Sequence, residues 1–226
     1  MQKKIFLIFI VSSLSFVALY FALVDKNYKH LSENLKVSHL IYNPDKKLSN
    51  FSLVDHNNNK FDNSNLIDKW TVLVFIYTHC PDVCPTELMD LSTLKGKLSK
   101  SNSSFMANYV AITFDPTRDT PEILKNYVTH FDKDFLGVSG EQSQIDRLVK
   151  DFGAYYERAM YDDNGELVII PNYAPLPDKA LEYGYTINHT AWIYLINPDG
   201  QIHAGFPTPH KLNDMMQDIK LLVDNY

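Results

Sequence analysis

The stretch that most constrains this chain is residues 70–91, where a strand-like pattern gives way to a helix-like one. Residues 72–77 read VLVFIY, and a short apolar run rich in β-branched and aromatic residues is typical of a buried strand. After a break of several residues, leucines recur with helical spacing at Leu88, Leu91 and Leu94. The sequence therefore predicts a strand, a short loop and a helix in this order.

The predicted loop carries the only two cysteines of the chain, Cys80 and Cys84. The N-terminal end of a helix favours thiolate over thiol, because its unpaired N–H groups and its dipole stabilise negative charge. Pro85 suits the first helical turn, which needs no N–H partner. Two thiols at Cys-x-x-x-Cys spacing can form a disulfide or bind a soft metal. The spacing alone does not decide between a disulfide and a metal site. A structural disulfide, or a pair of inert buried thiols, is a further alternative.

Composition narrows the class of protein. The chain has 226 residues, of which 45% are hydrophobic, and this fits one globular domain with an appendage. The net charge of −6 provides no basic surface for nucleic acid. Two cysteines are too few for a disulfide-rich scaffold, so their placement in one motif indicates chemistry or metal binding.

The first 25 residues predict a membrane anchor. Lys3 and Lys4 precede an apolar stretch at 5–24 that only three serines interrupt. Its length matches a bilayer-spanning helix of about 20 residues better than the core of a signal peptide, although a cleaved signal peptide is the alternative. The lysine pair would stay in the cytoplasm, and the rest of the chain would be exported. Residues 26–50 are polar and predict a linker.

Residues 51–226 predict one α/β domain. The pattern first indicates a hairpin around 55–59, followed by the strand and helix described above. A strand at 109–112, a helix that begins at Thr120-Pro121, a strand at 135–138 and a helix that ends at 152 come next. The last part holds a short hairpin with a surface excursion at 161–183, a hairpin around 198–200 and a final helix opened by Thr208-Pro209. This order predicts a thioredoxin-like fold, with a central mixed β-sheet flanked by helices. Right-handed crossovers would place the cysteines at the carboxyl edge of the sheet, where ligands bind.

If the two thiolates bind a metal such as copper, we expect a histidine as the third ligand, because imidazole is a good ligand for copper. His79 adjoins Cys80, but neighbouring side chains of a strand point to opposite faces, so we expect it to modulate the site. His189 precedes an apolar strand and lies in a segment that can reach the cysteine-bearing helix. Asp115 and Asp119 are either carboxylates near the site or turn and capping residues.

Three motifs in this order resemble the Sco/SenC family. They are THCPDVCP at 78–85, DPTRDTPE at 115–122, and His189 followed by the Pro-Asp-Gly turn at 198–200. The resemblance covers essentially the whole domain and implies a thioredoxin-like fold on an N-terminal membrane anchor. It also implies one copper ion bound by Cys80, Cys84 and His189, and a role in assembling the binuclear copper centre of cytochrome c oxidase subunit II.

The resemblance has two departures. Asn188 stands where the family often has an aspartate next to the histidine. The chain therefore lacks a carboxylate beside the histidine, and we expect weaker binding of Cu(II). The proline-rich region at 161–183 matches the family poorly, so its role in partner docking is open.

Two functions follow as expectations. The first is a copper metallochaperone that is not an enzyme, carries Cu(I) or Cu(II), and delivers it to cytochrome c oxidase subunit II or another copper protein. The second is a thiol–disulfide oxidoreductase in which Cys80 attacks and Cys84 resolves. By the resemblance, the domain faces the periplasm from the bacterial inner membrane, or the intermembrane space from the mitochondrial inner membrane.

Overall fold

A computed structural model of the chain describes residues 29–41, 47–101, 105–172 and 174–226. The expected anchor at 1–25 lies outside these residues. Within the described ranges, no helix combines the length and the apolar character needed to cross a membrane.

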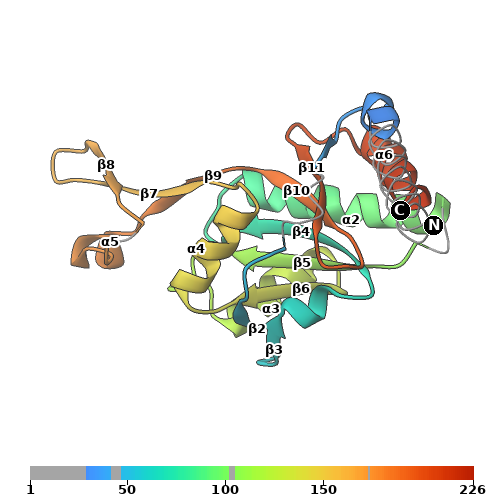
Figure 1. Cartoon of the computed structure of the whole chain (residues 1–226). Coiled ribbons are helices and arrows are strands. Elements are labelled where there is room, and N and C mark those ends of the chain that lie inside the picture. The colour runs from blue at the N-terminus through green and yellow to red at the C-terminus, as the bar shows by residue number, and fades with distance from the viewer. Residues whose placement is uncertain (1–28, 42–46, 102–104, 173) are drawn as a thin grey trace, which may run out of the picture.

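The fold is built on an eight-stranded mixed sheet (Figure 1). The strand order is β1-β11-β10-β4-β5-β6-β2-β3; within this described sheet, β4 pairs with β5 and β5 with β6 in parallel, and every other neighbouring pair is antiparallel. The strands are β1 (His39–Leu40), β2 (Ser52–Asp55), β3 (Lys60–Asp62), β4 (Trp70–Ile76), β5 (Ala107–Thr113), β6 (Phe135–Ser139), β10 (Trp192–Ile196) and β11 (Ile202–Pro207). This arrangement confirms the predicted α/β class with a central mixed sheet and helices around it.

The central strand β4 is the run that the sequence analysis placed in the core. All seven of its residues are buried, because β5 pairs with one edge, β10 with the other, and helices cover the sheet. Strands buried on both faces read as continuous apolar runs rather than as alternating ones.

Helices α2 (Val83–Ser101), α3 (Pro121–Phe131), α4 (Gln142–Asp151) and α6 (Leu212–Asp224) lie around the sheet, whereas α5 (Asp178–Tyr183) lies in the projecting arm. Residues 29–34 are also helical, and a short 3-10 helix covers Asn63–Leu66. The buried residues of α2 include Leu88, Leu91, Leu94 and Leu98, as the spacing predicted, and α2 contacts both α3 and α6. The Thr120 side chain caps α3 and Pro121 is its first residue, as predicted.

The last helix begins later than expected. Thr208-Pro209 does not open it; α6 starts at Leu212, after Lys211 as the N-cap residue. Residues 207–211 instead pass over the first turns of α2, where His210 meets a helix side chain.

A second, three-stranded antiparallel sheet forms an arm that projects from one end of the domain (Figure 1). Its order is β8-β7-β9, with strands β7 (Tyr156–Tyr161), β8 (Leu167–Ile170) and β9 (Thr186–His189). The predicted hairpin in the 161–183 region is confirmed as β7–β8, and the surface excursion contains α5. The arm returns the chain to the domain at His189.

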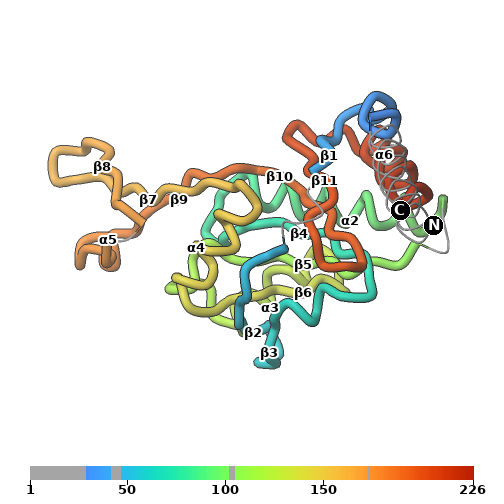
Figure 2. Tube along the Cα trace, viewed as in Figure 1, coloured from blue at the N-terminus to red at the C-terminus, as the bar shows by residue number. Residues whose placement is uncertain are grey.

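Residues 36–41 lie within the segment expected to be a polar linker, yet they pack on the domain. β1 pairs with β11 (Figure 2). The buried Asp218 carboxylate of α6 accepts hydrogen bonds from the N–H groups of Lys36, Val37 and Ser38 at 2.9 Å each, and from the Ser38 hydroxyl at 2.9 Å. Such backbone contacts leave no side-chain periodicity in the sequence, so the pattern could not reveal them.

Replacing Asp218 with alanine should destabilise the domain by about 2–4 kcal/mol, because it leaves the buried Ser38 N–H and hydroxyl and the part-buried N–H groups of Lys36 and Val37 without this acceptor. Urea unfolding measures this loss. Asp214, whose contact with Lys36 is 3.8 Å long and exposed, is the matched control; Asp214→Ala should cost less than about 1 kcal/mol. Equal costs for both variants would contradict the assignment.

Candidate metal centre

Cys80 and Cys84 lie where β4 passes into α2. Cys80 is in the loop after the strand, and Cys84 is the second residue of the helix. The backbone N–H of Cys84 donates a hydrogen bond to Cys80 Sγ at 3.3 Å. Both thiols are free, and both residues are buried. The helix start therefore directs a donor at the first sulfur, as its unpaired N–H groups predict.

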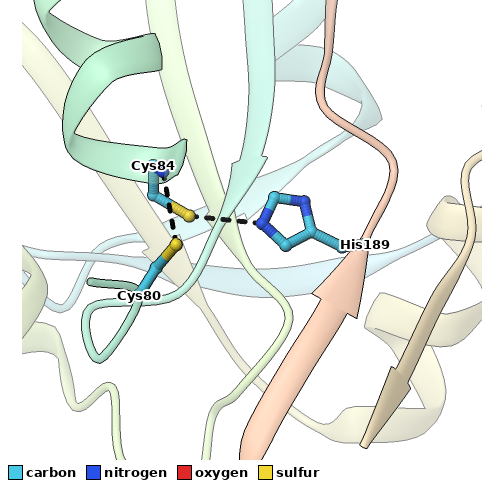
Figure 3. Close-up of side chains that lie close together, drawn as sticks. All are labelled: Cys80, Cys84 and His189. Atoms are coloured by element: carbon cyan, nitrogen blue, oxygen red, sulfur yellow. Dashed lines mark hydrogen bonds between the residues drawn. The ribbon is translucent and has the colours of Figure 1, made fainter. Parts of the chain in front are cut away.

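His189 reaches the cysteines from the end of β9 (Figure 3). Its Nε2 atom lies 3.4 Å from Cys84 Sγ, and the three potential ligand atoms of Cys80, Cys84 and His189 lie within 4.8 Å of one another. Nδ1 lies 3.0 Å from the carbonyl oxygen of Thr190. A proton on Nδ1 is donated to that carbonyl, so Nε2 is the ring nitrogen directed at the sulfurs; it donates to a sulfur when it is protonated and offers a lone pair when the ring is neutral.

The two thiols differ in acidity. The pKa of Cys80 falls to about 3, first because the Cys84 thiol donates a hydrogen bond to it and then because His189 does. The pKa of Cys84 is raised, because the same hydrogen bond holds its proton and because the side chain is buried. Burial lowers the pKa of His189, but its hydrogen bonds to Cys80 and to the Thr190 carbonyl outweigh burial and raise it. The unloaded site therefore holds one thiolate beside one thiol.

Aromatic rings fix the position of the imidazole. The ring centroid of Phe114 lies 5.0 Å from that of His189, and Tyr77 packs edge-on at 5.8 Å. Ordered packing of this kind limits the rotamers of a potential ligand before any metal arrives.

Two sulfurs and one imidazole nitrogen are the donors that soft metal ions prefer, and thiolate at the helix start supplies negative charge. The family resemblance implied that these three residues act together, and the structure places all three side by side. Their role as ligands remains a prediction.

Comparison with known proteins assigns the family. The SCO1/SenC family model matches residues 42–224. The chain belongs to the SCO1/SenC family. The SCO2-like protein of Rickettsia felis is 30% identical over 181 residues, which are 80% of this chain and 79% of that protein.

Solved structures of the SCO1/SenC family share the fold. Arabidopsis thaliana ScoI with copper bound matches with a TM-score of 0.66 and 26% identity, over 79% of this chain and 98% of that one. Yeast Sco1 with copper bound matches with a TM-score of 0.64 and 28% identity, over 80% of this chain and 90% of that one. The family assignment and the thioredoxin-like fold expected from the three motifs are confirmed.

Asp119 of this SCO1/SenC chain holds the loop that leads to the cysteines. Its buried carboxylate accepts hydrogen bonds from the Thr78 N–H at 3.0 Å, and from the hydroxyls of Thr78 and Thr113 at 2.5 Å each. Burial raises its pKa, although these hydrogen bonds oppose the shift. Asp119 thus fixes the residue two positions before Cys80 and is not part of the metal-ligand cluster.

Asp115 fastens the strand that carries His189. Its carboxylate pairs with Arg118 and accepts a hydrogen bond from the Tyr185 hydroxyl at 2.5 Å. The Arg118 guanidinium stacks 3.7 Å from the centroid of the Tyr185 ring and donates to the Tyr185 carbonyl at 2.8 Å. Tyr185 directly precedes β9. The structure therefore gives both aspartates a holding role close to the site, which combines the two sequence alternatives.

His79 and Asn188 lie outside the cluster. His79 is exposed, and its Nδ1 lies 3.2 Å from the Thr78 hydroxyl. The Asn188 amide donates to Glu157 on β7 at 3.3 Å. Adjacent strand residues point to opposite faces, so the residue beside His189 is directed away from the sulfurs. In this chain Asn188 therefore takes part in the contact between β9 and β7.

Sequence reasoning missed a buried acid–histidine pair next to the cysteines. Glu87, one helical turn beyond Cys84, lies 3.6 Å from Nε2 of His210, and both side chains are almost fully buried. Burial raises the pKa of Glu87. Its position within the apolar stripe of α2, directly before Leu88, was a signal that it faces the core.

The unequal thiols can be measured directly. We expect the ultraviolet thiolate absorbance of the reduced chain to show one thiolate at about pH 5, where an ordinary cysteine is protonated. Cys80→Ser should remove this absorbance, whereas Cys84→Ala should shift the titration upward because the remaining thiolate loses its side-chain hydrogen-bond donor. An absorbance that appears only above about pH 8 would show that Cys80 is an ordinary thiol.

Replacing Asp115 with asparagine should destabilise the fold by about 2–4 kcal/mol, because the half-buried Arg118 guanidinium then keeps its charge without a counterion. Urea unfolding again gives the value. Asp163, which pairs with Lys179 in the exposed part of the arm, is the control: Asp163→Asn should change stability by less than about 1 kcal/mol. If Asp115→Asn left the free energy of unfolding unchanged, this result would contradict the idea that Asp115 fastens β9.

Proposed function

We propose that this chain is a copper metallochaperone that binds one copper ion through Cys80, Cys84 and His189. The observation that carries the proposal is the convergence of two sulfurs and the free nitrogen of one imidazole within 4.8 Å. Two family members of the same fold, from Arabidopsis thaliana and yeast, have structures with copper bound. Thiolate and imidazole together favour Cu(I), while an imidazole ligand also accepts Cu(II).

The three residues have separate tasks in loading. Cys80 is already a thiolate and offers the first donor, whereas Cys84 must release its proton when it binds the ion. His189 offers Nε2 once the proton that it donates to Cys80 has left, while its Nδ1–H stays bonded to the Thr190 carbonyl. Two donors belong to the junction of β4 and α2 and the third to β9, so a receiving protein can take the place of one donor while the others still hold the cargo.

The proposed recipient is the binuclear copper centre of cytochrome c oxidase subunit II, or another copper protein. This part rests on the function that the Sco/SenC resemblance implies. The proposed setting is a single N-terminal anchor, with the domain on the periplasmic side of the bacterial inner membrane or on the intermembrane-space side of the mitochondrial one. The lysine pair before the apolar stretch at 5–24 supports this orientation.

A second candidate function is thiol–disulfide exchange with the cysteines of a copper-site target. The low pKa of Cys80 favours it, since thiolate is the attacking species. Cys80 would attack the target disulfide, Cys84 would then attack the mixed disulfide, and two electrons would pass to the target as a Cys80–Cys84 disulfide forms. This chemistry uses both cysteines and does not need His189.

Cu(I) titration of the reduced chain against a chromophoric chelator tests the proposal. We expect one tightly bound ion per chain, and an affinity that falls by at least about 100-fold in His189→Ala, because one of three donors is lost. His79→Ala is the matched control, since His79 is exposed and adjoins Cys80; it should bind like the parent.

The same titration separates the two functions. Weak binding in the parent chain and in His189→Ala, together with a readily reduced Cys80–Cys84 disulfide, would favour the oxidoreductase. Unchanged one-to-one binding in Cys80→Ala or Cys84→Ala would contradict the proposed site itself.

A further inference from the structure

The outer strand of the arm has a free edge. β8 pairs with β7 on one side, and no other strand in the described part of the chain pairs with it. The arm projects away from the main sheet (Figure 1). An exposed edge strand presents unpaired N–H and C=O groups to which another chain can add a strand.

The direction of these backbone groups follows from the hairpin. The Asp162 N–H donates to the Glu166 carbonyl at 2.9 Å, which makes these two residues a hydrogen-bonded pair. Hydrogen-bonded and non-bonded pairs alternate along an antiparallel ladder. Leu167 and Ile169 therefore direct their N–H and C=O groups away from β7, whereas Val168 directs its own toward β7.

The side chains of β8 are unusually open to solvent. Leu167 is 50% exposed, Val168 44% and Ile169 47%. Successive strand residues point to opposite faces, so both faces of this edge are accessible and apolar. Glu166 precedes the run and Pro171 follows it, which limits the open edge to the length of a short strand.

Charge on the arm is strongly acidic. Residues 157–183 contain six acidic and two basic side chains, a net charge of −4 out of −6 for the whole chain. Lys179 pairs with Asp163, and Arg158 is buried and donates to three backbone carbonyls. The exposed, unneutralised charge around β8 is therefore negative.

We propose that β8 binds an extended segment of a partner protein by strand addition, and that this segment carries apolar residues flanked by lysine or arginine. The backbone groups of Leu167 and Ile169 would supply the hydrogen bonds. The exposed side chains would supply apolar contact, and the acidic rim would select a basic partner. This surface is separate from the metal centre and does not rest on the proposed copper function.

The same charge argues against two other occupants. A second copy of this chain would bring two acidic arms together, which like-charge repulsion opposes. An anionic lipid surface would likewise be repelled. A basic extended segment is the occupant that satisfies the backbone edge, the apolar side chains and the charge together.

The arm sheet connects the free edge of β8 to the candidate metal centre. β7 lies between β8 and β9, and Tyr156 of β7 is paired with His189 of β9. A strand added to β8 would extend the sheet whose opposite strand carries His189. A partner bound there is joined to the proposed ligand by one continuous hydrogen-bonded ladder.

Hydrogen exchange on the full-length chain in a neutral detergent tests the proposal. The probe is a synthetic peptide of alternating valine and threonine with two lysines at each end. We expect it to slow exchange of the Leu167 and Ile169 amides by at least about tenfold. The same peptide with glutamates at its ends should have no effect, and about 0.5 M salt should weaken the lysine form.

Two variants make the test specific. Ile169→Pro removes an outward N–H without touching the β7 ladder and should abolish binding of the labelled peptide, while Ile169→Val should bind like the parent. Retained thiolate absorbance of Cys80 would show that the proline variant is folded. If the proline variant is not folded, a double variant tests the charge instead. Glu166→Lys combined with Glu182→Lys, at two exposed positions, should bind the peptide with glutamate ends more tightly than the peptide with lysine ends.

Other outcomes would overturn the proposal. Equal binding of both peptides, or unchanged binding in Ile169→Pro, would exclude strand addition by a basic segment. Protection of 167–169 that rises with protein concentration would identify a second copy as the occupant. Protection without peptide in nanodiscs that contain phosphatidylglycerol would identify lipid.

Discussion

The pairing of β9 with β7 is the interaction on which the candidate site depends. It places His189 opposite Tyr156 and within 3.4 Å of Cys84. Cys80 and Cys84 are held locally, by one loop and one helix start, but the third residue arrives from the end of a separate sheet. The two halves of the site are therefore stabilised by different parts of the fold.

Two buried carboxylates join these halves to the domain. Asp119 accepts hydrogen bonds from Thr78 on the cysteine side, while Asp115 engages Arg118 and Tyr185 on the histidine side. Both aspartates belong to the same turn between β5 and α3. A buried carboxylate is costly unless it is fully hydrogen-bonded, and the partners of these two carboxylates come from both sides of the site.

Local patterns predicted most of the fold, and long-range contacts supplied the rest. The β4 run, the leucine stripe of α2 and the cap of α3 are encoded within a few residues, and all are confirmed. The proximity of His189 to Cys84 spans 105 positions; its place in the sequence made it a candidate, and only the family resemblance assigned it as a ligand. The contact of Glu87 with His210 and the attachment of residues 36–38 to Asp218 depend on packing that no periodicity reports.

Attachment of residues 36–38 to α6 also bears on how far the domain can travel. With an anchor that ends at residue 25, as proposed, ten residues separate the membrane from the point where the chain is fixed to Asp218. Residues 29–34 of this stretch are helical, so the ten residues together span at most about 25 Å. The domain would then explore a thin layer next to the bilayer rather than the whole compartment, and its encounters would be confined to proteins that present their copper sites at that height.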